Sequence, residues 1–130
     1  LGRWLRHRGR VGVVSLYLRC EPLEQALRLL KREGSALLSE TAGTFLGAEN
    51  FTSLAACAVA LREHAMNEAA EVLERQAART AADRARMWDL YGVELDDECA
   101  YDAIIDTTRA SIDECVTRME RVCVALAHAR

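Results

Sequence analysis

Three charged side chains with helical spacing are the first candidates for chemistry in this sequence. Arg79, Asp83 and Arg86 stand at positions i, i+4 and i+7 of an alanine-rich segment. On an α-helix this spacing brings two guanidiniums and one carboxylate to the same face. Guanidiniums hold phosphate through charge-assisted, often bidentate hydrogen bonds, so the triplet indicates a phosphate-binding site. The alternative is an ion-pair stripe on the surface, which contributes little to stability.

Charge is distributed unevenly along the rest of the chain. Residues 1–10 carry four arginines and no acid, whereas residues 87–108 carry seven acids and no base. The formal net charge of −3 argues against a dedicated nucleic-acid-binding protein, although a basic start suits local contact with a nucleic-acid backbone. We expect the acidic segment to be a solvated polar face rather than a metal site. The arginines of the basic start are Arg3, Arg6, Arg8 and Arg10.

The cysteines and histidines do not form a metal-binding pattern. The five cysteines are widely spaced with no C-x-x-C pair, and the three histidines stand far from one another and from any cysteine. We therefore expect no resident metal or cofactor in this chain, and buried thiols typical of a reducing compartment, the cytoplasm or the mitochondrial matrix. No run of about 18 consecutive apolar residues is present, so no membrane span is predicted.

The first half of the chain begins with a strand followed by a helix. Residues 11–18 form a short β-branched and apolar run, typical of a strand covered on both faces. After Pro22, apolar residues at helical spacing predict a helix that ends at Gly34. Residues 35–50 hold two glycines and several small polar residues, and we interpret them as a loop.

The second half predicts a long helix, a second strand and a last helix. From Thr52 or Ser53 the pattern runs to Tyr91, and because nearly 40 residues is long for one helix we expect a break near residues 78–82. Residues 101–107 are a second buried-type strand, and Ser111 with Glu114 indicates the start of the last helix. The apolar face of that helix is expected to pack on the sheet through Cys115, Met119, Val122 and Leu126.

Two strands that each precede a helix must lie parallel, so the fold class is α/β with residues 12–18 beside residues 102–107. Parallel sheets occur almost only with several strands, and a two-stranded one leaves open edges. We therefore expect a missing N-terminal half or a partner chain to complete the sheet. A first residue that is leucine rather than methionine fits this expectation.

The segment around the charged triplet resembles the cytidylate kinase family. Residues 83–92, Asp-Arg-Ala-Arg-Met-Trp-Asp-Leu-Tyr-Gly, are similar to the family pattern D-R-x-R-Y-x-x-L-Y-G, and residues 101–111 are similar to its final strand and turn, Y-D-L-V-I-D-T-S-x-L-S. The resemblance implies a partial P-loop-kinase-like fold in which Arg79 and Arg86 are catalytic lid residues. It also implies that Asp83 binds substrate. Gly2-Arg3 is similar to a Gly-Arg pair of the family, which implies that Arg3 binds substrate as well.

Other features depart from that family. The sequence contains no Gly-rich loop ending in Lys-Ser or Lys-Thr, the element that cradles ATP phosphates in such kinases. The family also places arginines after the Pro-Leu-Glu turn where this chain has Ala26 and Leu29. By this resemblance, residues 1–34 correspond to the kinase-like core, 35–60 to an atypical excursion, 61–92 to a lid-type segment and 93–130 to the last strand and helix, all parts of one incomplete domain.

Two functions remain open at this point. One is a non-catalytic, kinase-like structural subunit of a larger assembly, for which an organellar ribonucleoprotein such as a mitochondrial ribosome is one setting. The other is the C-terminal part of an active kinase that transfers phosphate from ATP to CMP, with ATP and magnesium bound by the complete enzyme. Because the phosphate loop is absent, we expect no turnover from this chain alone.

Overall fold

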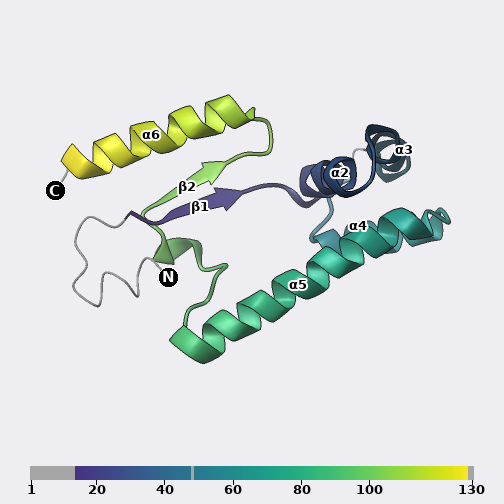
Figure 1. Cartoon of the computed structure of the whole chain (residues 1–130), viewed down its shortest axis with the longest axis horizontal. Coiled ribbons are helices and arrows are strands. Elements are labelled where there is room, and N and C mark those ends of the chain that lie inside the picture. The colour runs from purple at the N-terminus through teal and green to yellow at the C-terminus, as the bar shows by residue number, and fades with distance from the viewer. Residues whose placement is uncertain (1–13, 48, 129–130) are drawn as a thin grey trace. The chain divides into compact units, whose positions relative to one another are not determined.

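A computed structural model describes residues 14–47 and 49–128 of the chain (Figure 1). These residues divide into two compact units, and the boundaries fall between Arg19 and Cys20 and between Asp83 and Arg84. The helical unit comprises residues 20–83, and the strand unit comprises the described parts of residues 1–19 and 84–130. In chain order the elements are β1 (Leu16–Arg19), α2 (Pro22–Glu33), α3 (Ala36–Leu46), α4 (Leu54–Glu63), α5 (Asn67–Tyr91), the short 3₁₀ helix η1 (Glu98–Ala100), β2 (Ala103–Asp106) and α6 (Ile112–His128).

The strand unit contains a two-stranded parallel sheet, which confirms the α/β class and the predicted pairing. In this sheet β1 runs beside β2, with Leu16 opposite Ala103 and Arg19 opposite Asp106 (Figure 1). Polar contacts hold both ends of the pair. The Ser15 amide donates to Asp102 Oδ2 at 2.8 Å, and the Thr107 amide donates to the Arg19 carbonyl at 2.7 Å. The predicted strand residues 11–13 lie outside the described part of the chain.

The last helix begins as predicted. The Ser111 hydroxyl accepts the Glu114 amide at 3.2 Å, which satisfies one of the donors that a helix leaves unpaired at its first turn. Helix α6 packs against β2, and the expected face is the one turned inward. That face is half-buried, however, and no side chain of α6 is fully buried. Its half-buried residues are Cys115, Met119, Val122 and Leu126.

The helical unit has an apolar core of its own. Helix α2 ends at Gly34, as predicted, where the Gly34 amide donates to the Leu30 carbonyl at 2.9 Å. Each of α2, α3, α4 and α5 contributes buried side chains to a single cluster. The largest fully buried side chains of this cluster are Leu30, Leu46, Cys57, Leu61 and Leu73.

The interpretation of residues 35–50 as a loop is wrong, because residues 36–46 form α3. The Ser35 hydroxyl accepts the Leu38 amide at 3.0 Å and starts the helix. The small polar residues that suggested a loop are accommodated within the helix; the Thr41 hydroxyl, for example, donates to the Leu37 carbonyl at 2.8 Å. Burial of Ala42 and Leu46 then favours the helix over the local preference for a turn.

The predicted position of the break in the long helix is also wrong. The pattern does start after Ser53 and stop at Gly92, which adopts a positive φ of 62°. The break, however, separates α4 from α5 at residues 64–66, where Ala65 has a φ of 57°, and α5 runs unbroken through residues 78–82. The chain turns at Ala65 so that Leu61 and Leu73 can both be buried in the core.

Candidate functional site

The structure places the three residues of the charged triplet on helix α5, as the spacing predicts. Arg79 and Arg86 are exposed and Asp83 is half-buried. Arg79 and Asp83 belong to the helical unit, whereas Arg86 belongs to the strand unit. Arg3, the fourth predicted site residue, lies outside the described residues, and so do Arg6, Arg8 and Arg10. The structure therefore brings the triplet onto one helix and adds no further predicted site residue to it.

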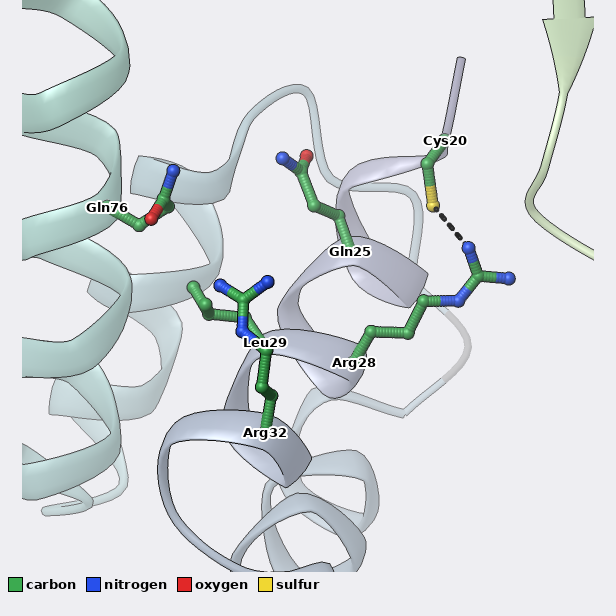
Figure 2. Close-up of a pocket in the computed structure, with 6 residues that line it drawn as sticks. All are labelled: Cys20, Gln25, Arg28, Leu29, Arg32 and Gln76. Atoms are coloured by element: carbon green, nitrogen blue, oxygen red, sulfur yellow. Dashed lines mark hydrogen bonds between the residues drawn. The ribbon is translucent and has the colours of Figure 1, made fainter. Parts of the chain in front are cut away.

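A surface cavity of about 300 Å³ lies in the helical unit (Figure 2). Helix α2 contributes one of its faces, because Gln25, Arg28 and Arg32 follow one another at spacings of three and four residues. Gln76 reaches the cavity from α5. The complete lining is Cys20, Gln25, Arg28, Leu29, Arg32 and Gln76.

The contacts of the Arg28 side chain include Glu24 and Cys20. Its Nε donates to Glu24 Oε1 at 3.1 Å, an i, i+4 pair along α2, and its Nη1 donates to the Cys20 sulfur at 3.6 Å (Figure 2). The Glu24 pair is exposed to solvent and of the kind that contributes only a few tenths of a kcal/mol. A stronger anionic partner can therefore replace Glu24 at the Arg28 guanidinium.

Arg32 supplies a second guanidinium on the other side of the lining. Figure 2 shows its side chain directed back along α2 beside Leu29, whereas Arg28 is directed toward Cys20. Arg32 pairs with Glu33 at 3.4 Å, and the side chains of both partners are more than half exposed. On α5, the Gln76 amide donates to the Thr80 hydroxyl at 3.4 Å.

The lining chemistry favours an anion. Two guanidiniums and two carboxamides supply hydrogen-bond donors, and the six lining residues include no carboxylate. The lining also includes no histidine or carboxylate that could act as a general base. The donors of the lining are therefore suited to binding an oxyanion.

Sequence reasoning missed these residues, although part of the signal was present. The spacing of Gln25, Arg28 and Arg32 was visible on the predicted helix, in the same way as that of the charged triplet. Gln76 carried no signal, since its position beside α2 depends on the turn between α4 and α5. The departures noted at Ala26 and Leu29 are explained by packing, because both side chains are buried in the core.

A polar network in the strand unit involves the acidic segment. Arg19 lies 3.5 Å from carboxylate oxygens of both Glu98 and Asp106, and Arg84 lies 2.6 Å from Asp96. Hydrogen bonds from Thr108, together with the nearby Arg19, lower the pKa of Asp106. The expected solvated polar face is thus partly paired with arginines.

Two tyrosines lie within the same strand unit. The rings of Tyr17 and Tyr101 lie 5.0 Å apart, and the Tyr101 hydroxyl donates to the Leu95 carbonyl at 2.7 Å. Burial raises the pKa of each phenol, and nearby carboxylates raise it further. These contacts join β1 to the segment before β2, which is a structural role.

Within residues 14–47 and 49–128, no helix is long and apolar enough to cross a membrane. The same residues contain no group of three metal-ligating side chains close enough to hold a metal ion. All five cysteines are free thiols, and Cys57 is buried in the core of the helical unit. Set against protein-family models, curated proteins and solved structures, the chain has no significant match in any of the three comparisons.

Proposed function

We propose that this chain is a structural subunit of a larger assembly, with a kinase-like fold and no phosphoryl transfer of its own. The observation that carries the proposal is the small core of the strand unit. Among its described residues, Ile105 is the single buried apolar side chain. A unit that buries so little apolar surface by itself gains stability by docking on a partner.

The surfaces available for docking are apolar. In the described residues β1 and β2 pair only with each other, so each strand has an edge with no described neighbour. On the sheet, Leu18 and Ile104 are 52% and 39% exposed. On α6, Ile112 at the first position and Val124 near the C-terminal end are 84% and 56% exposed. A partner strand at the sheet edge and a partner surface against α6 would cover these side chains.

An organellar ribonucleoprotein, such as a mitochondrial ribosome, is the assembly that we propose. The support is the basic start of the sequence, where four arginines in ten residues can neutralise RNA phosphates. The residues that line the cavity also support a structural role rather than phosphoryl transfer. The cavity of the helical unit has no histidine or carboxylate among its lining residues, and the sequence has no phosphate loop.

The experiment that tests this proposal is gradient sedimentation of the tagged chain from its native cells. We expect it to sediment with a large particle, to shift to lighter fractions after ribonuclease treatment, and to be released by the double substitution Ile112→Asp and Val124→Asp. The matched control is Leu37→Asp with Val59→Asp, which places the same charges on exposed apolar residues of the helical unit. Sedimentation as a free chain of 14.4 kDa, or equal release by the control, would contradict the proposal.

A second candidate is the C-terminal part of an active nucleoside-monophosphate kinase. The observation in its favour is that Arg79, Asp83 and Arg86 lie on one continuous helix at the spacing the family uses. In this function the two arginines neutralise the transferring phosphate while Asp83 orients them.

An assay of phosphate transfer from ATP to CMP separates the two candidates. The structural proposal predicts no turnover and no saturable CMP binding by the chain. Kinase function predicts turnover of about 1–100 per second from the complete protein. It also predicts that Arg86→Ala weakens CMP binding by about 1.5–3 kcal/mol, the cost of losing charged hydrogen bonds.

A further inference from the structure

We infer that the cavity between α2 and Gln76 binds a small phosphorylated metabolite with two separate anionic groups. This inference concerns the helical unit alone and does not depend on the proposed docking of the strand unit. It rests on three properties of the lining: its charge, the placement of its two guanidiniums, and its size.

The charge of the lining is opposite to that of the chain. The protein carries a formal net charge of −3, yet the ionised groups that line the cavity are two guanidiniums. Carboxylates do contact these arginines, Glu24 at Arg28 and Glu33 at Arg32, but neither glutamate lines the cavity. Both ion pairs are at least one-third exposed, so each is weak and is readily exchanged for a phosphate.

The placement of the guanidiniums indicates two anionic groups rather than one. Arg28 is directed toward Cys20 and Arg32 lies beside Leu29, so the two cations serve different parts of the lining (Figure 2). The carboxamides of Gln25 and Gln76 provide further donors to the ligand. A single phosphate would use one guanidinium, whereas a ligand with two anionic groups would use both.

The size of the cavity suits a compact ligand. A volume of about 300 Å³ is at the lower end of the range found for small-molecule sites. Leu29 gives the lining one apolar surface, against which the carbon skeleton of such a ligand can pack. These dimensions favour a phosphorylated sugar or acid over a polymer.

Titration of the full chain at constant ionic strength tests the inference, with fructose 1,6-bisphosphate and inorganic phosphate as the probes. We expect the bisphosphate to bind at least tenfold more tightly than phosphate, because it engages a second charged partner. Equal affinity for the two probes, or no binding of either, would overturn the inference. Binding of phosphate alone would overturn it as well.

Substitutions with a matched control separate the site from general electrostatic attraction. Arg28→Gln and Arg32→Gln should each weaken bisphosphate binding about tenfold or more, with the melting temperature unchanged because both side chains are exposed. Arg75→Gln removes the same charge from an exposed residue next to Gln76 that does not line the cavity. The affinity of this control should stay at the wild-type value, and a loss equal to that of Arg28→Gln would overturn the inference.

The rate at which the Cys20 thiol is alkylated reports on ligand binding, because Cys20 lines the cavity. Its sulfur accepts a hydrogen bond from Arg28, so a ligand held by Arg28 should shield it from alkylation by iodoacetamide. We expect the bisphosphate to slow the labelling of Cys20 several-fold and to leave the exposed Cys123 unaffected. Unchanged labelling of Cys20 at a saturating bisphosphate concentration would overturn the inference.

Discussion

The helical unit and the strand unit are stabilised by different kinds of contact. Four helices of the helical unit bury a continuous apolar cluster that includes Leu30, Leu61 and Leu73. In the strand unit, the described residues bury Ile105 and otherwise rely on polar contacts between chain segments. The comparison shows that a high content of apolar residues in a segment is not sufficient to form a core. Apolar side chains stabilise a unit only where the fold removes them from water.

The polar contacts of the strand unit have a specific arrangement. They join residues far apart in sequence, as in the Ser15 amide with Asp102 and the Thr107 hydroxyl with the Arg19 carbonyl. Such contacts define the register of β1 on β2, and each contributes about 0.5–1.5 kcal/mol. They give the strand unit a defined geometry while its apolar faces stay available to a partner.

The largest expected effect comes from the core of the helical unit. Leu73→Ala should lower the free energy of unfolding by about 2–5 kcal/mol, because Leu73 is fully buried and its loss leaves a cavity. Chemical denaturation measures the loss, and hydrogen exchange should locate it in α2, α3 and α4. A change below about 1 kcal/mol would mean that this cluster does not form the core of the unit.

The next effect concerns a polar contact in the strand unit. Asp102→Ala should cost about 1–3 kcal/mol, because the amide of the buried Ser15 then loses its acceptor. The control is Asp102→Asn, which keeps an oxygen acceptor and should retain most of the stability. If both substitutions cost the same, the carboxylate charge rather than the hydrogen bond is what matters. Exchange of the Ser15 amide, followed by NMR, measures the difference directly.

The pH dependence of stability should distinguish the two units. Burial raises the pKa of the Cys57 thiol from 9.0 to about 11. The unfolded chain therefore loses this proton near pH 9 while the folded chain keeps it. The contribution of this thiol to stability is constant below pH 9 and falls as the pH rises toward 11. The phenols of Tyr17 and Tyr101, whose pKa values are also raised, add to the fall only above their ordinary value of 10.0.

Denaturation series at pH 8, 9 and 10 measure this dependence. Between pH 9 and 10 the slope should come mainly from Cys57, and Cys57→Ala should flatten it. Tyr17→Phe should instead reduce the slope above pH 10. An unchanged slope between pH 9 and 10 in the Cys57→Ala variant would show that the thiol is accessible to solvent in the folded state.

The smallest effect is expected at the first residue of α6. Ile112→Ser should change the stability of the isolated chain by no more than about 0.5 kcal/mol, because Ile112 is 84% exposed. Thermal unfolding of the purified chain measures this change. A loss above 1 kcal/mol would mean that the Ile112 side chain is already covered, and it would remove the contrast between the two units.

Several elements could be predicted from the sequence because their signals are local. The parallel pair β1 and β2 followed from two short apolar runs that each precede a helix. The start of α6 followed from Ser111 and Glu114, and the end of α5 from Gly92, which supplies the positive φ that closes a helix. The spacing of Arg79, Asp83 and Arg86 likewise required only that their segment be helical.

Other features were decided by the tertiary structure. Residues 36–46 have the composition of a loop, and they are helical because Ala42 and Leu46 reach a core made by other helices. The turn at Ala65 exists because it buries Leu61 and Leu73 together, although its alanine carries no turn signal. The cavity also depends on this turn, which brings Gln76 beside Arg32. The local sequence determines which conformation a segment prefers. Contacts between residues distant in sequence determine whether the folded chain adopts that conformation.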